Sequence, residues 1–355
     1  MRIFAFHLLN DFSGSPKVLR QLLLGWAGHG IEVHLTTTTD RDGFLSDLEG
    51  VVYHPFWYSF AENKVLRLLF LFASQTMLFF RTLFLVRKDD IVYVNTVLPF
   101  GAGLAGKLRG CRVIYHVHET SIKPAILKKF LFGIARMAAS EAIFVSGFLA
   151  KEETGFRKSH ILYNALPGDF NTNRNPGARS TPEGNVLMVC SLKWYKGVDE
   201  FLRLATENPH MHFRLVVNAD NSDIAAYFSG SRMTQNLEIF PVQKDVRPFY
   251  EWADVVLNLS RPDGWVETFG LTAIEAMSYG LPVIVPPVGG IAELVEDGVN
   301  GFKADSRDMV NVGRILGDIL GSQDLYNHLS KGALDRAGDF SEGKFLKGSL
   351  DILRF

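Results

Sequence analysis

The feature that most restricts the fold is an alternation of strand-like and helix-like segments that runs twice along the chain. In the first half, short apolar and β-branched runs occur at residues 3–8, 31–36, 51–54, 91–94, 111–117 and 142–145. Helical patterns fall between most of them. This alternation predicts a parallel sheet covered by helices on both faces, with ligands at the carboxyl ends of the strands.

The alternation is interrupted once. Residues 167–184 read PGDFNTNRNPGARSTPEG and contain almost no apolar residue, which is typical of a linker. Strand-like runs then resume at 186–190, 213–217, 237–240, 255–259 and 283–285. We therefore predict an α/β protein with two Rossmann-like parallel-sheet domains, 1–166 and 185–340, that face each other across a cleft. A final helix within 341–355 has apolar residues suited to packing back on the first domain.

The most informative stretch, residues 260–302, predicts a loop, a helix at 271–279, a strand, a Gly-Gly loop and a second helix that closes at Asp297-Gly298. Gly270 stands where the first helix begins. The free N–H groups of Gly270 and Leu271 and the helix dipole favour an anion there, above all phosphate.

Two carboxylates accompany this helix, Glu267 before it and Glu275 within it. Glu275 lies among apolar residues, where a carboxylate is unfavourable unless it receives hydrogen bonds. Ribose hydroxyls beside a helix-bound phosphate would donate them. The alternative is that Glu275 faces water and Glu267 is an ordinary loop residue.

The sequence ETFGLTAIEAMSYGLPVI, followed by GGIAELVEDGVNGF, resembles the donor-binding signature of glycosyltransferase family 4. These are retaining enzymes with the GT-B fold. The resemblance implies that Glu275 binds the donor ribose and that Glu267 holds sugar hydroxyls beside the anomeric carbon. It also implies that Phe269, Gly270 and Leu271 cradle the diphosphate.

A second segment, SLKWYKG at 191–197, ends the first strand of the second domain. The family has a Lys-Gly pair here that binds donor phosphates, which corresponds to Lys196. It usually has an Arg five residues earlier, where this chain has Ser191. Lys193 would replace the charge, but a lysine lacks the bidentate fork of arginine. Lys196 is alternatively an ordinary exposed lysine.

The first domain begins with a strand, the loop NDFSGSPK and a helix expected over 16–27. The resemblance places Gly14 and Ser15 near the donor phosphates and the acceptor, although a plain βα turn has the same pattern. His116 and His118 share one strand face. A metal site would need a third ligand, and none is evident beyond Glu119. The resemblance implies that His118 contacts the donor sugar or the acceptor.

A rival motif, GAGLAG at 101–106, matches a dinucleotide-binding fingerprint and suits an NAD-dependent enzyme. A true fingerprint follows its strand directly, whereas residues 95–100 intervene here and Pro99 is typical of a helix start. We therefore expect these glycines inside a helix that packs tightly on the sheet.

Composition excludes other classes. The net charge is −1, which argues against nucleic-acid binding, and the chain is 47% hydrophobic and 21% charged, as in globular proteins. Cys111 and Cys190 form no metal-spaced cluster and indicate a reducing compartment. The N-terminus reads as a first strand without a cleavage site, which predicts a cytoplasmic protein.

Residues 64–88, KVLRLLFLFASQTMLFFRTLFLVRK, predict a long apolar helix. Its longest uncharged run, 68–80, is shorter than the roughly 20 residues that span a bilayer. At helical spacing, one stripe combines basic and apolar residues; it consists of Lys64, Arg67, Leu71, Ser74, Leu78, Arg81, Leu85 and Lys88. We expect this stripe to face outward and the other faces to pack on the sheet. With the basic-apolar segment at 123–137, it predicts peripheral binding to an anionic membrane, at the inner face. The alternative is a core helix with a few solvated charges.

Together these patterns predict a retaining, metal-independent hexosyl- or glycosyltransferase with no cofactor. The donor is a nucleotide sugar, with UDP, GDP and dTDP not distinguished, and the acceptor is a glycan or lipid-linked sugar of cell-surface polysaccharide or glycolipid synthesis. Glu267, His118 and Lys196 are the expected catalytic residues. A sugar-nucleotide epimerase of the same fold and a non-catalytic sugar-binding protein are the alternatives. No acidic cluster such as Asp-x-Asp is apparent, so we predict no metal site.

Overall fold

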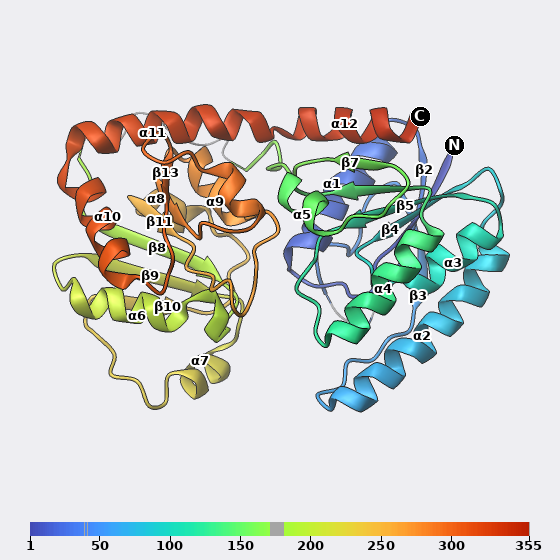
Figure 1. Ribbon diagram of the computed structural model, residues 1–355, viewed down its shortest axis with the longest axis horizontal. Helices are drawn as coiled ribbons and strands as arrows, with labels where there is room; N and C mark the ends of the chain where they lie inside the picture. The colour runs from blue at the N-terminus through green and yellow to red at the C-terminus, as the bar shows by residue number, and fades with distance from the viewer. Residues whose placement is uncertain (39, 41, 171–180, 355) are drawn as a thin grey trace. The chain divides into compact units, whose positions relative to one another are not determined.

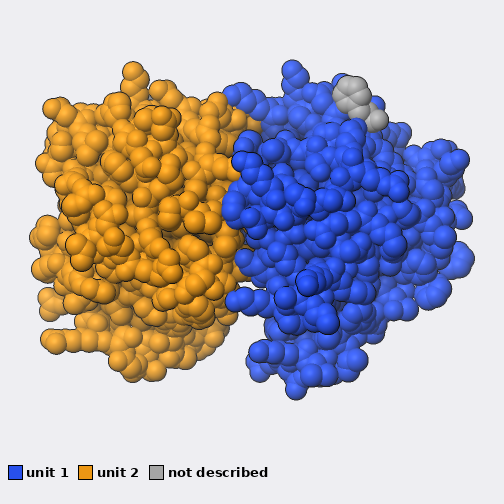
Figure 2. Space-filling model, viewed as in Figure 1, with its two compact units in different colours: residues 1–165, 342–355 blue, residues 166–341 orange. Residues whose placement is uncertain are grey.

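The computed structural model describes residues 1–38, 40, 42–170 and 181–354. The chain divides into two compact units (Figure 2). The first contains residues 1–165 and 342–355, and the second contains residues 166–341. Most of the expected linker, residues 171–180, lies outside the described residues.

The first unit is built on a seven-stranded parallel sheet with the order β3-β2-β1-β4-β5-β6-β7 (Figure 1). Its strands are β1 (Arg2–Phe6), β2 (Glu32–Thr38), β3 (Val51–Phe56), β4 (Ile91–Asn95), β5 (Arg112–Val117), β6 (Glu141–Phe144) and β7 (Ser159–Ile161). The strand order reverses direction between β1 and β4. The crossover connections between these parallel strands then place helices on both faces of the sheet, as the sequence predicts.

The described residues of this unit form the helices α1 (Gly14–Gly28), α2 (Lys64–Leu85), α3 (Phe100–Leu108), α4 (Ala125–Ala138), α5 (Gly147–Glu152) and α12 (Glu342–Arg354). α12 comes from the far end of the chain and packs on α1. Trp26 Nε1 donates a hydrogen bond of 3.1 Å to Ser349 Oγ, and Arg112 donates to the carbonyls of Ile352 and Leu353. Gly25 lacks the Cβ that would lie 2.5 Å from Leu346 Cδ1, which allows the two helices to approach closely.

The second unit is built on a six-stranded parallel sheet with the order β10-β9-β8-β11-β12-β13. Its strands are β8 (Asn185–Cys190), β9 (His212–Val217), β10 (Leu237–Phe240), β11 (Val255–Leu257), β12 (Val283–Val285) and β13 (Gly301–Lys303). The order reverses direction between β8 and β11. This point is where ligands bind in open α/β sheets.

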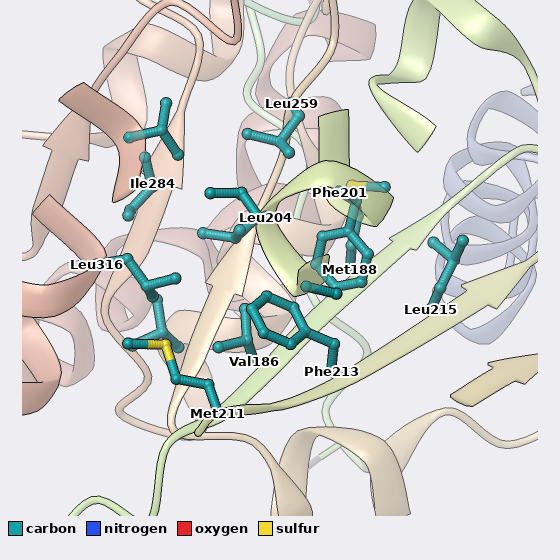
Figure 3. Close-up of a cluster of buried hydrophobic side chains, with 14 of the residues drawn as sticks. Val186, Met188, Phe201, Leu204, Met211, Phe213, Leu215, Leu259, Ile284 and Leu316 are labelled. Atoms are coloured by element: carbon teal, nitrogen blue, oxygen red, sulfur yellow. The ribbon is translucent and has the colours of Figure 1, made fainter. Parts of the chain in front are cut away.

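The helices of the second unit are α6 (Val198–Glu207), α7 (Asn221–Tyr227), α8 (Arg247–Trp252), α9 (Leu271–Ser278), α10 (Met309–Gly321) and α11 (Gln323–Ala337), with 3-10 turns η1 (Trp194–Lys196), η2 (Gly290–Leu294) and η3 (Gly338–Phe340). Figure 3 shows part of the core. Phe201 and Leu204 of α6 lie against Met188 of β8 and Phe213 of β9. This apolar layer fixes α6 on the sheet, and η1 directly precedes α6.

Two sequence predictions about local structure are wrong, and one helix begins slightly earlier than predicted. β7 and β13 are missing from the predicted strands, because each has only three residues and no continuous apolar run. The helix expected after Gly290 is only the 3-10 turn η2, which ends at Leu294. α1 starts at Gly14, two residues before the predicted helix, so Gly14 and Ser15 belong to its first turn.

The predicted orientation of α2 is also wrong. Leu71, Ser74 and Leu78 in the middle of the predicted outward stripe are buried, whereas the basic residues at its ends and many apolar side chains of the other faces are exposed. α2 packs mainly on α3 and not on the sheet, so only a narrow face finds partners. The buried face suits that contact because Gln75 Oε1 accepts a 3.1 Å hydrogen bond from the Gly101 N–H.

Candidate active site

The N-terminus of α9 forms one wall of the candidate site in the second unit. Gly270, which precedes it, has φ +100°, a left-handed conformation that favours glycine. A Cβ at this position would lie 2.5 Å from Ile291 Cγ1. The first turn of α9 therefore presents main-chain N–H groups and the positive end of the dipole, as the sequence predicts.

Lys196 and Glu267 meet beside this helix start. Lys196 ends η1, after β8, and its Nζ forms an ion pair with Glu267 Oε1. The same oxygen accepts a 2.8 Å hydrogen bond from Ser260 Oγ, which follows β11. Lys196 Nζ also lies 5.2 Å from the centre of the Trp265 ring. The pair thus stands at the carboxyl ends of β8 and β11, at the reversal of strand order.

The electrostatics of this pair are set by competing effects. Burial alone would raise the pKa of Glu267. The Lys196 charge, together with hydrogen bonds from Lys196, Ser260 and Trp265, holds the pKa of this carboxyl below its ordinary value. Glu267 is therefore an anion at neutral pH.

The Gly-Gly loop positions the backbone of Glu267. The Gly290 N–H donates a 2.8 Å hydrogen bond to the Glu267 carbonyl. Gly289 has φ +104°, and a Cβ there would collide with the same carbonyl. The sequence predicts a loop at Gly289-Gly290, and the structure shows that this loop positions the backbone of Glu267.

Glu275 is on α9 and only 4% exposed. Tyr250 Oη donates a 2.7 Å hydrogen bond to its Oε2, and both side chains are buried. Burial, followed by the negative charge of Glu275, raises the pKa of Tyr250 well above its ordinary value. The alternative in which Glu275 faces water is therefore wrong. Nothing in the segment RPFYEW that carries Tyr250 indicates this partnership.

The other predicted donor-binding side chains of this unit are those of Phe269, Ser191 and Lys193. The Phe269 side chain is buried against Phe340, with ring centres 5.8 Å apart, so only its main chain is available to a ligand. Ser191 and Lys193 follow β8 in one turn, in which the Lys193 N–H donates to the Ser191 carbonyl. The side chain of Lys193 is exposed.

A second polar group lies in the first unit, at the carboxyl ends of β1, β4 and β5. Asn95 Nδ2 donates to the Ser15 carbonyl at 3.2 Å and to His7 Nδ1 at 3.0 Å. Since a carbonyl only accepts, the Asn95 amide orientation is fixed. Its Oδ1, which is 2.9 Å from His118 Nε2, must then accept, so His118 carries its proton on Nε2. The group links the predicted residues Ser15 and His118.

The histidines of this group are neutral at neutral pH. Burial lowers the pKa of His7 to about 4 and that of His116 to about 3. Burial, then the neighbouring His116 and His7, lowers the pKa of His118 well below its ordinary value. Burial raises the pKa of Glu119 to about 7, and its carboxylate accepts from the main-chain N–H of Val97 and His118. Among the described residues, no three His, Cys, Asp or Glu side chains form a metal-binding group.

The rival glycine motif does not form a phosphate loop. Gly101, Gly103 and Gly106 lie within α3 and are buried. A Cβ on Gly106 would lie 2.8 Å from Val92 Cγ2 of β4, and one on Gly103 would collide with the Tyr115 hydroxyl. The glycines allow close helix packing, which confirms the sequence prediction. Because they are buried within a helix, these glycines do not form the dinucleotide-binding site that the rival motif suggests.

The predicted residues thus form two groups, one in each unit. Lys196, Glu267 and the start of α9 are together in the second unit, and Ser15 and His118 are together in the first. The sequence did not identify four residues that complete these groups: His7, Asn95, Tyr250 and Ser260.

Comparison with known proteins finds a glycosyltransferase family model for each of the two units. Residues 12–166 match the family model described as Glycosyltransferase Family 4, and residues 183–320 match Glycosyl transferases group 1. A D-inositol 3-phosphate glycosyltransferase of Salinispora tropica is 34% identical over 122 residues, which cover 34% of this chain and 24% of that protein. The aligned part spans about a quarter of the length of the first such relatives.

Two solved structures share the whole fold. HepE of Anabaena, in complex with UDP and glucose, has a TM-score of 0.78 and 18% identity, and the match covers 100% of this chain and 99% of that one. Sucrose-phosphate synthase of Thermosynechococcus elongatus has a TM-score of 0.80 and 16% identity, over 100% and 98%. These likenesses show the GT-B fold class of two parallel-sheet α/β units.

Proposed function

The chain belongs to glycosyltransferase family 4, of the group 1 type, and we propose that it moves a sugar from a nucleotide-sugar donor to a glycan or lipid-linked acceptor. The anomeric configuration is retained, and no metal ion or other cofactor takes part. The product belongs to cell-surface polysaccharide or glycolipid synthesis in the cytoplasm.

The observation that carries this proposal is the meeting of Lys196, Glu267 and the start of α9 at one point of the second sheet. The diphosphate of the donor binds the free N–H groups of α9 and the Lys196 ammonium. Both stabilise the negative charge that develops as the bond from the anomeric carbon to the phosphate oxygen breaks. The acceptor oxygen attacks that carbon from the same face, and its proton passes to the departing phosphate.

Glu267 has a different role from Lys196. Its carboxylate is ionised because the Lys196 charge and the hydrogen bonds from Lys196 and Ser260 lower its pKa. It binds hydroxyls of the transferred sugar and stabilises the positive charge on the sugar ring in the transition state. Glu275 binds the ribose with the carboxylate that Tyr250 holds in place.

The group in the first unit serves the sugar or the acceptor. The Asn95 hydrogen bond fixes the His118 ring and its tautomer, with the proton on Nε2 and the lone pair on Nδ1. His118 contacts the transferred sugar or the acceptor. Gly14 and Ser15 contribute the first turn of α1 beside it.

A two-stage experiment tests the proposal. Thermal unfolding is first measured with UDP-, GDP- and dTDP-sugars, since a ligand of the folded state raises the unfolding temperature. UDP-sugars come first because the HepE structure contains UDP. The stabilising donor is then incubated with glycan and lipid-linked acceptors, and the anomeric configuration of the product is determined by NMR.

Transfer with the donor's configuration is expected. An isomerised nucleotide sugar formed without acceptor would identify an epimerase, and an inverted product would overturn retention. Donor binding without turnover on any acceptor would favour a sugar-binding protein.

A further inference from the structure

The more apolar side of α2 is exposed, although apolar side chains are usually buried. Its buried residues are Leu71, Ser74, Gln75, Leu78 and Thr82, which form the face against α3. The opposite face carries large apolar side chains at spacings of three and four residues. Phe84 is 90% exposed, and Val65, Leu69 and Phe80 are each more than half exposed. So many large apolar side chains on one helix face are unusual for a surface in water.

α4 carries a similar stripe. Ile126, Lys129, Phe130, Gly133 and Met137 are exposed at spacings that place them on one face. Ile126 is 78% exposed. The stripe therefore presents apolar side chains around a single basic residue.

The exposed faces of α2 and α4 are continuous. The Phe72 ring of α2 contacts the Phe130 ring of α4, with centres 5.5 Å apart, and both rings contact Phe100 at the start of α3. α2, α3 and α4 are neighbours in the first unit (Figure 1). The segment before α2 extends the surface, because the exposed Trp57 packs on Phe70 of α2.

We refer to this surface as the apolar face. Its exposed members are Trp57, Phe60, Val65, Leu66, Leu68, Leu69, Phe72, Met77, Phe80, Phe84, Ile126, Phe130 and Met137.

Basic residues predominate around the apolar face, although Glu62 stands between Phe60 and Val65 and Asp40 lies beside Trp57 and Met77. Residues 64–88 contain five basic residues and residues 123–139 contain four, and neither segment contains a carboxylate, although the whole chain has a net charge of −1. Lys128 and Arg136 are ion-paired with Glu153. Lys64, Lys123 and Lys129 are exposed, and Arg67 lies over the Phe60 ring at the margin of the apolar face. A partner complementary to the apolar face would be apolar inside and negatively charged at its boundary.

α2 is also long and apolar enough to cross a membrane, by length and composition alone. Its packing favours a different placement. Ser74 Oγ donates to the Leu71 carbonyl within α2, and Gln75 Oε1 accepts from the Gly101 N–H of α3. An α2 inserted across a bilayer would lose this contact, whereas an α2 lying along the surface keeps it.

We propose that the first unit docks on an anionic lipid bilayer through the apolar face, with α2 and α4 lying in the interface. Leu69, Phe80 and Phe84 enter the boundary between headgroups and acyl chains. Trp57 lies at headgroup depth, and the lysines contact lipid phosphates. This docking goes beyond the proposed function and holds for any sugar that the chain transfers.

The experiment is co-sedimentation of the full-length chain with vesicles of phosphatidylcholine alone, or mixed with phosphatidylglycerol, at low and high salt. The wild type is expected to pellet with the anionic vesicles, less at high salt, and to remain in the supernatant with phosphatidylcholine. Changing Leu69, Phe80 and Phe84 to Ser should lower the bound fraction at least tenfold. Changing Lys64, Arg67 and Lys129 to Gln should weaken binding on the order of a hundredfold, since each basic residue contributes about fivefold.

A matched control carries Val310→Ser and Met233→Ser, which alter exposed apolar residues of the second unit. It should bind as the wild type does. All variants should unfold at the wild-type temperature, because the changed side chains are exposed.

Three outcomes overturn the proposal. The wild type stays in the supernatant with anionic vesicles at low salt, or the Leu69, Phe80 and Phe84 variant pellets as well as the wild type. In the third, the wild type is released from membranes only by detergent and not by carbonate, which would mean that α2 spans the bilayer. Light scattering identifies the remaining occupant: a dimer that the same variant converts to a monomer, without vesicle binding, would make the apolar face an interface between two copies.

Discussion

The ammonium group of Lys196 forms an ion pair with the carboxylate of Glu267, which is 71 residues away in the sequence. The sequence predicts separate roles for the two residues, one at the diphosphate and one at the sugar. The contact means that the Lys196 charge helps to keep Glu267 ionised. A donor diphosphate would attract the same ammonium, so donor binding and the state of Glu267 are coupled.

This coupling predicts a shifted pH profile. Lys196→Met removes the charge that keeps the pKa of Glu267 low, so the acidic limb of kcat/KM should move to higher pH. Lys196→Arg keeps the charge and should leave the limb in place. Glu267→Gln should lower kcat by about 10²–10³-fold with nearly unchanged nucleotide affinity. An acidic limb that stays in place in Lys196→Met would show that Lys196 does not control Glu267.

The sequence predicted much of the fold and of the site for physical reasons. The apolar runs of β1, β4 and β8 form central strands, and the Gly270 and Gly280 signals mark the ends of α9 to within a residue. Contacts between distant residues were not predicted. Tyr250 reaches Glu275, and Asn95 reaches His118, because of strand order and helix placement, which leave no pattern in the letters.

The orientation of α2 shows a different limit. Helical periodicity placed Leu71, Ser74 and Leu78 on one face of α2, but the prediction buried the wrong side of the helix. The usual rule buries the more apolar side, and here α3 selects the side with Ser74 and Gln75. Since the partner of a helix decides which stripe is buried, the periodicity of α2 alone could not determine it.

The second prediction separates the roles of Glu275 and Tyr250. Glu275→Ala should weaken the binding of donor and of free nucleoside diphosphate alike, because it removes the ribose contact. Tyr250→Phe removes only the hydrogen bond to Oε2, so it should cost about 1–3 kcal/mol of stability with a much smaller loss of nucleotide affinity. Calorimetry with the nucleotide and urea unfolding measure the two effects. Unchanged nucleotide binding in Glu275→Ala would reject the ribose role.

The third prediction is metal-independent transfer. Lys196 and the start of α9 supply positive charge for the diphosphate. Activity should therefore survive excess EDTA, with kcat within about twofold of the untreated enzyme. The rate is measured before chelation, after it and after addition of magnesium or manganese. Activity that disappears in EDTA and returns with either ion would contradict the prediction.

The fourth prediction concerns acid stability. The pKa of His7 is lowered to about 4 and that of His116 to about 3, so the folded state stays neutral while the unfolded state binds protons below its ordinary pKa. Stability should therefore fall as pH drops from about 6.5 to about 4, by up to about 1.4 kcal/mol per pH unit for each histidine. The pKa of Glu119, raised to about 7, has the opposite sign and partly offsets this loss.

The variant His116→Asn isolates one histidine from the offset, because Glu119 is present in both proteins. Urea unfolding across this pH range should give a shallower slope for the variant, by about 1.4 kcal/mol per pH unit. An equal slope in the two proteins would mean that His116 takes up protons in the folded state as readily as in the unfolded one.

The last prediction tests whether the glycine motif of α3 serves packing or a ligand. A Cβ at Gly101 would collide with the Gln75 carbonyl of α2, which belongs to the backbone and cannot move aside. Gly101→Ala should therefore destabilise the protein by about 1–3 kcal/mol through overpacking. Gly133→Ala in α4 is the matched control. Nothing lies within 4 Å of its Cβ, so the better helix propensity of alanine should stabilise the protein by about 0.5–1 kcal/mol. Urea unfolding measures both, and titration with NAD should show no binding to wild type or variant. Binding of NAD that Gly101→Ala abolishes, with stability unchanged, would restore the dinucleotide interpretation.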